Sequence, residues 1–204
     1  MSKTVYIDLE TTGLNAEKHG IWQLAAIFEE GGEVKDQICL EMKPFPGKLV
    51  SPQALAHSRM TLDELKLLQE PLAAFRQLED WLGKFISKYK KTDKSIFKAY
   101  NGAFDYQFMR QWYKDAENDY FGSWFLHPYH DILQKAAYVL TPERYQMENF
   151  KLGTVCRYVG IDFDDEMAHD GAYDIRKTRE LDKYLDTRIM ILSPKTASFR
   201  PVAA

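Results

Sequence analysis

The stretch that decides the fold lies near the N-terminus, where residues 5–13 read VYIDLETTG. Residues 4–9 are rich in Val, Tyr and Ile, which predicts a strand there. Side chains alternate between the two faces of a strand, so Asp8 and Glu10 point the same way while Leu9 points into the core. Two neighbouring carboxylates on a buried strand are costly, and a bound cation relieves that cost. The alternative is a solvent-facing strand that carries two acids.

Outward from this strand, the sequence predicts a hairpin followed by alternating strands and helices. A Gly-Gly pair at 31–32 is a hairpin turn signal between strands predicted over 22–29 and 33–42. Thr61 and Glu64 fit a capping box at the start of a short helix. A further strand is predicted over 95–100, and helices are predicted over 72–89, 104–114, 131–140, 152–159 and 171–185. This order predicts one α/β domain with a mixed sheet covered by helices.

Two segments are not expected to form regular elements. Prolines and a glycine between residues 44 and 52 predict an irregular connection. Residues 191–204 contain scattered Pro, Ser and Ala and are expected to form a flexible C-terminal tail. That assignment leaves residues 1–190 as a single domain.

The composition limits the kind of partner and the compartment. The 204 residues are 45% hydrophobic and carry a formal net charge of −3, so the chain should fold but lacks the basic excess of proteins that grip long duplexes. Six lysines lie within residues 84–98 and form either a solvated surface or a basic surface that attracts a nucleic-acid backbone. Cys39 and Cys156 are expected to be reduced thiols. With no signal-peptide or membrane-span pattern, a soluble cytoplasmic protein without membrane contact is expected.

Three more candidate site residues lie further along the chain. Asp105 follows a predicted strand and a Tyr-Asn-Gly turn, near the first turn of a helix, where the helix dipole alone would favour an acid. His169 and Asp174 are five residues apart, which on one helix would place them about 140° apart. Both reach one site only if His169 precedes the helix and Asp174 lies within it. Gly171 near the helix entry permits that arrangement.

These residue types suit the same chemistry. Carboxylates are hard oxygen ligands that bind Mg²⁺ or Mn²⁺. Two such ions about 3.5–4 Å apart can activate a water and stabilise the departing oxygen of a phosphoryl displacement. An imidazole, with an ordinary pKa near 6.5, can accept the proton of that water at neutral pH. The sequence contains no zinc-type spacing of Cys and His, and no glycine-rich loop followed by lysine.

At these residues the chain resembles the DEDDh family of 3′–5′ exonucleases, over about residues 4–185. The three family motifs D-x-E-T-T-G, Asn preceding Asp, and H-x-x-x-x-D are matched by Asp8, Glu10, Thr11, Thr12 and Gly13, by Asn101 and Asp105, and by His169 and Asp174. Each motif is weak alone, but the three in order are specific. The resemblance implies a ribonuclease H-like fold: a mixed five-stranded sheet with one antiparallel strand, flanked by helices.

The resemblance also implies a role for each candidate residue. It makes His169 the general base and assigns two Mg²⁺ ions, with Mn²⁺ able to substitute, to Asp8, Glu10, Asp105 and Asp174. The residues it implies as substrate contacts are Thr11, Thr12, Gly13, Leu14, His57 and Asn101. This chain departs from the family in having Ser58 after His57 and Asp170 beside His169, an acid that is expected to alter the pKa of the base or the substrate preference.

The implied activity is that of a metal-dependent 3′–5′ exonuclease. It would release nucleoside 5′-monophosphates from the 3′ end of single-stranded nucleic acid, with DNA favoured over RNA and proofreading beside a DNA polymerase as one setting. An RNA-trimming exoribonuclease, an inactive exonuclease-like interaction module, and an endonuclease that cuts RNA in hybrids stay open. The intact set of five catalytic residues argues against the inactive module, and the His-x₄-Asp spacing favours the exonuclease over the endonuclease.

Overall fold

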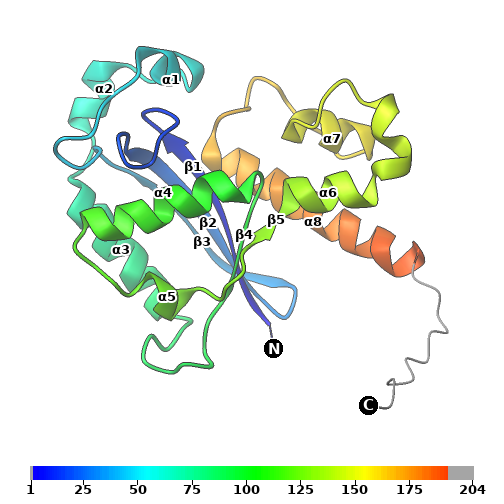
Figure 1. Cartoon of the computed structure of the whole chain (residues 1–204), viewed down its shortest axis with the longest axis horizontal. Helices are drawn as coiled ribbons and strands as arrows, with labels where there is room; N and C mark the ends of the chain where they lie inside the picture. Colours follow the sequence, from blue (N-terminus) through cyan, green and yellow to red (C-terminus); the bar gives the residue numbers. More distant parts are fainter. Residues whose placement is uncertain (1, 193–204) are drawn as a thin grey trace, which may run out of the picture.

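Five strands form the central sheet of the computed structural model, which describes residues 2–192 (Figure 1). The strands are ordered β3-β2-β1-β4-β5 and comprise β1 (Lys3–Thr11), β2 (Ile21–Glu30), β3 (Glu33–Glu41), β4 (Ile96–Ala99) and β5 (His130–Asp131). Only β2 runs opposite to the others, since it pairs antiparallel with β1 and β3, whereas β1, β4 and β5 pair in parallel. The expected mixed five-stranded sheet with one antiparallel strand is confirmed.

The β2–β3 hairpin forms where the Gly-Gly pair predicted it. Gly31 and Gly32 both have positive φ, at 61° and 91°, and Glu30 pairs with Glu33 across the turn. Two consecutive residues with positive φ are what a tight two-residue hairpin turn requires, and glycine adopts them without a steric cost. The turn therefore helps to set the β2–β3 register, in which Gln23, near the start of β2, pairs with Glu41 on β3.

Helices cover the sheet on both faces. They are α1 (Pro52–His57), α2 (Leu62–Leu67), α3 (Pro71–Gly83), α4 (Gly102–Asp115), α5 (Phe121–Trp124), α6 (Ile132–Val139), the 3₁₀ helix η1 (Thr141–Gln146), α7 (Leu152–Tyr158) and α8 (Gly171–Leu192). The capping box of Thr61 and Glu64 is confirmed, because each residue's side chain accepts the other's backbone N–H.

The elements differ from the predictions at three places. The helix predicted over 72–89 ends at Gly83, although Phe85 and Ile86 still pack against or within the core from the following turns. Residues 43–51 form the expected irregular connection, but the helix α1 that follows was not predicted; it begins at Pro52 with Ser51 as its N-cap, as proline at a first helical position favours. Residues 191 and 192, the first two of the expected tail, belong to α8. Residues 193–204 lie outside those described.

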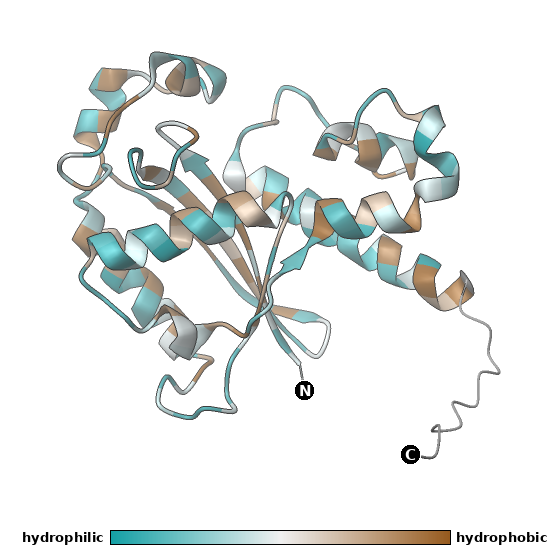
Figure 2. Cartoon of the chain, viewed as in Figure 1, coloured by the Kyte–Doolittle hydropathy of each residue, from teal (hydrophilic) through white to brown (hydrophobic). Residues whose placement is uncertain are grey.

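The two faces of β1 serve different purposes. Val5, Ile7 and Leu9 point into the larger core, which is closed by α3 and α4. The alternate side chains, of which Tyr6 and Asp8 are examples, face α8. Figure 2 shows apolar residues concentrated on the strands and hydrophilic ones on the outer surfaces of the helices. Among residues 2–192, no helix combines the length and apolarity needed to cross a bilayer.

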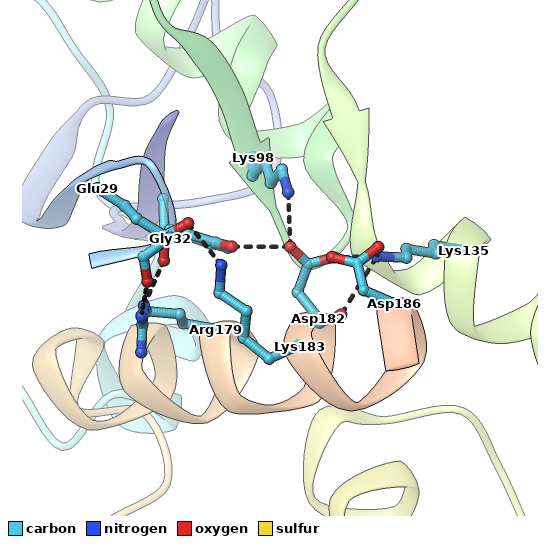
Figure 3. A network of polar contacts seen from close by, with 9 residues as sticks. Glu29, Gly32, Lys98, Lys135, Arg179, Asp182, Lys183 and Asp186 are labelled. Atoms are coloured by element: carbon cyan, nitrogen blue, oxygen red, sulfur yellow. Dashed lines mark hydrogen bonds and ion pairs between the residues drawn. The ribbon is translucent and has the colours of Figure 1, made fainter. Parts of the chain in front are cut away.

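A buried polar network holds α8 against the sheet (Figure 3). Asp182, which is 0% exposed, accepts a hydrogen bond from the Tyr6 hydroxyl at 2.8 Å and pairs with Lys98 at 2.7 Å and Lys135 at 2.5 Å. Burial alone would raise the pKa of Asp182, but the two ammonium groups leave it below its ordinary value. Because its partners come from β1, β4 and α6, this carboxylate ties α8 to three other elements.

A second part of the same network lies on β2. Glu29, which is 4% exposed, pairs with Arg179 at 2.8 Å and Lys183 at 2.6 Å. Arg179 also donates to the Gly32 carbonyl in the hairpin turn at 3.1 Å. The middle of α8 is therefore fixed over β2 as well as β1, which leaves its first turn at a defined place above the sheet.

The lysines at 84–98 are mostly engaged within the fold. Lys84 pairs with Asp36 at 3.6 Å and Lys88 with Glu79 at 2.9 Å. Lys94 donates to the Gly122 carbonyl, and Lys98 belongs to the buried network. They precede or lie in β4, whereas nucleic-acid and nucleotide ligands of parallel sheets bind beyond the carboxyl ends of the strands. This placement favours a structural role for these lysines over a role in binding a nucleic-acid backbone.

Candidate active site

A pocket of about 400 Å³ opens beyond the carboxyl ends of β1 and β4. Its lining contains all five expected catalytic residues and four of the expected substrate contacts, namely Asp8, Glu10, Asp105, His169, Asp174, Thr11, Leu14, His57 and Asn101. The chain thus brings together residues that are up to 166 positions apart in sequence, from Asp8 to Asp174. The edge of a sheet beyond its parallel strands is the usual ligand site of such folds.

Two expected substrate contacts lie behind this lining. Thr12 is fully buried, and its hydroxyl donates to the Leu49 carbonyl at 2.7 Å and accepts the Gly20 N–H at 3.0 Å. A Cβ at Gly13 would lie 2.2 Å from the His19 ring. Both residues brace the loop that presents Leu14, whose side chain is 86% exposed at the pocket rim.

The two β1 carboxylates stand in a strongly acidic environment. Burial raises the pKa of Asp8 well above its ordinary value, and repulsion from Asp105 and Asp174 adds to this. Burial also raises the pKa of Glu10 to about 7. The hydroxyl of Ser58, which donates to the Ala54 carbonyl at 3.0 Å, lies close enough to Glu10 to oppose that shift.

Asp105 reaches the pocket from the first turn of α4. It is 4% exposed, and burial raises the pKa of its carboxyl although nearby backbone N–H groups act in the opposite sense. Asn101 precedes α4 in the left-handed region, at φ 62°, and its side chain makes no capping hydrogen bond with the helix. The amide of Asn101 is therefore available to the pocket.

His169 and Asp174 lie on opposite sides of the α8 boundary, as their spacing predicted. His169 precedes the helix with a φ of 68°, and Asp174 lies in its first turn. The His169 backbone N–H donates to Asp174 Oδ2 at 3.1 Å. The other oxygen, Oδ1, is buried without a hydrogen-bond partner among residues 2–192, and burial raises the pKa of Asp174 to about 6.

The surroundings of His169 favour its neutral form. Burial lowers the pKa of the imidazole, and the neighbouring His57, Arg59 and Lys151 lower it further. The rings of His57 and His169 pack at 4.1 Å between centroids with a 52° tilt. A neutral imidazole can accept a proton, which a general base must do.

Asp170 has a structural explanation. Its Oδ1 accepts the Tyr173 N–H at 2.8 Å and its carbonyl accepts the Asp174 N–H at 2.9 Å, so it caps the start of α8. It adds to the upward pKa shifts of Asp8, Glu10 and Asp174. Aspartate before the first turn of a helix is a common N-cap, a signal that the sequence did contain.

Several lining residues were not predicted from the sequence. Ser58, which follows α1, contributes a hydroxyl, and Phe104 on α4 and Leu152 on α7 contribute two apolar walls. Phe104 is adjacent to Asp105, and that proximity in sequence was the one available signal. Ser58 was noted only as a departure from the family pattern, and nothing local marks Leu152.

The donor set fits divalent ions whose ligands are shared with substrate and water. Within the described residues, no three His, Cys, Asp or Glu side chains already form a closed site for one ion. Mg²⁺ is typically held by one or two carboxylates together with substrate phosphates, so an open arrangement is suitable. Oδ1 of Asp174, which has no hydrogen-bond partner within residues 2–192, fits a cation there, as does the mutual repulsion around Asp8.

Comparison with known proteins agrees with this geometry. A family model described as RNase_T, Exonuclease, matches residues 5–181. Ribonuclease T of Actinobacillus pleuropneumoniae is 29% identical over 185 residues, which cover 87% of this chain and 80% of that protein. The PolC-type DNA polymerase III of Thermotoga maritima is 30% identical over 151 residues, covering 73% of this chain but 10% of the polymerase.

Solved structures show the same fold. Exonuclease I of E. coli in complex with a dT13 oligonucleotide superposes with a TM-score of 0.75 at 22% identity, covering 94% of this chain and 42% of that one. The chain spans less than half of that enzyme and about a tenth of the polymerase. From the family match along most of its length, the chain belongs to the RNase_T exonuclease family, the hydrolytic 3′–5′ exonucleases of the DEDD type.

Proposed function

We propose that this chain removes nucleotides one at a time from the 3′ end of single-stranded nucleic acid, DNA in preference to RNA, and releases nucleoside 5′-monophosphates. One observation carries the proposal: four carboxylates and a histidine that favours its neutral form line one open pocket. Because the pocket is about 400 Å³ in volume, it suits the end of a strand rather than a duplex.

In this proposal Asp8, Glu10, Asp105 and Asp174 hold two Mg²⁺ ions, which Mn²⁺ can replace. When bound, such ions supply positive charge that offsets the negative charge developing on the phosphoryl group. The protein's contribution is to keep the four carboxylates together despite their repulsion, and the buried network under α8 holds that helix in place against the sheet.

His169 acts as the general base. The lowered pKa of its imidazole keeps it neutral near pH 7, so it can accept the proton of the attacking water. Its position outside α8 and its backbone bond to Asp174 place it beside the carboxylates. Contact with the His57 ring limits where the imidazole can point.

The terminal nucleotide is held by the rest of the pocket. Leu14 and Phe104 offer apolar surface to the last base, and His57 and the free amide of Asn101 offer polar groups to the sugar and phosphate. Thr11 lines the same wall, while Thr12 and Gly13 act indirectly through the Leu14 loop.

The comparisons support two candidate substrates, and one setting, work beside a polymerase. A single-stranded DNA end is supported by the exonuclease I structures with dT13 and dA16, and work beside a polymerase is supported by the PolC-type relatives. RNA trimming is the second candidate, favoured by the ribonuclease T relatives, which match along 80% of their own length.

The test is digestion of 5′-labelled single-stranded DNA and RNA oligomers of one sequence with Mg²⁺. We expect a ladder that shortens from the 3′ end, faster on DNA, and lost in Asp8→Asn and His169→Gln. Asp80→Asn, which removes an exposed acid on α3, serves as the control. Immediate internal cuts would favour an endonuclease, faster RNA trimming would favour the second candidate, and no cleavage of either polymer would contradict the activity.

A further inference from the structure

Gln23 connects the sheet to the start of α8 through a buried side chain. It is 7% exposed, and its Oε1 accepts the Gly171 N–H at 3.0 Å. Its Nε2 donates to Glu41 Oε1 on β3, also at 3.0 Å. The three residues come from β2, α8 and β3, which meet only in the folded chain.

The Gly171 N–H is one of the first-turn donors that a helix cannot satisfy by itself. Because it is buried, losing its acceptor would leave an unpaired polar group, which is costly. A Cβ at Gly171 would lie 2.8 Å from Gln23 Oε1 and 3.3 Å from Asp8 Oδ2. The first turn of α8 therefore packs directly against the floor of the pocket, and the Gln23 side chain sets the distance between this turn and the sheet.

The Gln23 side-chain amide supplies both a donor and an acceptor at this position, which a carboxylate cannot do. Gln23 pairs with Glu10 on one side and Glu41 on the other in the strand register, so it stands between two acids on the same face of the sheet. A carboxylate at this position would extend a row of like charges. An amide instead gives a donor to Glu41 and an acceptor to Gly171, and the Glu41 bond prevents the amide from flipping.

Resting on the proposed function, we propose that Gln23, oriented by Glu41, is a positioning residue for His169 and Asp174. Gly171 lies two residues after His169 and three before Asp174, so a shift of this backbone moves the base and a carboxylate together. Neither Gln23 nor Glu41 lines the pocket with the carboxylates, so both act through Gly171.

The test compares three variants with a matched control. Gln23→Met keeps the volume and removes both hydrogen bonds, Glu41→Gln keeps an acceptor for the Gln23 amide, and Glu41→Met removes that acceptor. The control is Gln37→Met on β3, whose exposed side chain makes no hydrogen bond within the described residues. The readouts are amide hydrogen exchange at Gly171, Mn²⁺ binding by titration, and kcat and KM on a single-stranded oligomer.

For Gln23→Met we expect faster exchange at Gly171, and Mn²⁺ affinity and kcat each lowered about 10-fold to 100-fold with KM little changed. Glu41→Gln should match the wild type, and Glu41→Met should fall between. If Gln23→Met does not fold, the Glu41→Met and Glu41→Gln pair decides by the same readouts.

Wild-type exchange and Mn²⁺ affinity in Gln23→Met, or equal losses in Glu41→Gln and Glu41→Met, would overturn the proposal. Exchange and Mn²⁺ binding do not require nucleolysis. A wild-type protein that cuts no polymer would therefore contradict the exonuclease activity while the positioning role is still decided by these two readouts.

Discussion

Without metal, the carboxylates around Asp8 should make this protein less stable as pH rises. The pKa of Glu10 is raised from 4.5 to about 7 and that of Asp174 from 3.8 to about 6, mainly by burial. A carboxyl with a raised pKa keeps its proton longer in the folded state than in the unfolded state. The free energy of unfolding therefore falls as pH rises from about 4 to about 7, and the loss is complete above that window.

The expected size follows from Glu10. At about 1.4 kcal/mol per pKa unit, its shift corresponds to about 3 kcal/mol, which partial exposure to solvent reduces to about 2 kcal/mol. For a chain of this length that is a change in melting temperature of about 4–8 °C. The neutral variant Glu10→Gln should therefore melt about 4–8 °C above the wild type at about pH 8 in a chelator.

The assay is thermal unfolding followed by circular dichroism in EDTA, at about pH 5 and about pH 8. The difference between Glu10→Gln and wild type should shrink at the lower pH. It should also vanish or reverse with excess Mg²⁺, which binds only the wild-type set tightly. Glu17→Gln, which removes an exposed acid, controls for the loss of one charge. Because His169 has a lowered pKa and acts with the opposite sign, the comparison between variants is the decisive quantity. A Glu10→Gln protein no more stable than wild type at the higher pH would refute the reasoning.

Three further predictions concern catalysis, the buried network and the pocket rim. His169→Gln should lower kcat about 10²-fold to 10⁴-fold, and the acidic limb of the wild-type pH–rate profile should lie below the ordinary histidine pKa; an unchanged kcat would exclude the base role. Asp182→Asn should cost about 3–5 kcal/mol in urea unfolding because it leaves Lys98 and Lys135 without their buried partner, whereas Asp186→Asn, at a half-exposed carboxylate, should cost much less; equal losses would contradict this. Leu14→Ser should raise KM for an oligomer without changing the melting temperature, since the side chain is 86% exposed; a large drop in melting temperature would show a packing role instead.

Much of the fold was predictable because local patterns and tertiary packing agree in the first half of the chain. The alternation around Asp8 gave the two faces of β1, and the Gly-Gly pair gave the hairpin. β5 was missed because two residues carry no periodic signal, and His130–Asp131 leads directly into α6. The end of α3 was missed because Phe85 keeps the helical spacing while packing against the core from a turn.

The candidate site was predictable where a residue acts through its own chemistry. Asp8 and His169 could be singled out because carboxylate pairs and a lone imidazole have recognisable uses, and the spacing to Asp174 correctly placed the helix boundary between them. Gln23 was not predictable, since its role depends on Glu41 and Gly171, which lie 18 and 148 residues away. Partners this distant are set by the fold and leave no local pattern.

The most direct measurement of the central claim is the order of product release from a single-stranded oligomer. The oligomer would carry one label in its 3′-terminal nucleotide and a second label at an internal position. With Mg²⁺, the first labelled product should be the 3′-terminal nucleoside 5′-monophosphate, and the internal label should follow only after a lag. No release should occur with Asp174→Asn. Internal label released first, a 3′-phosphorylated product, or equal release by Asp174→Asn would contradict the account.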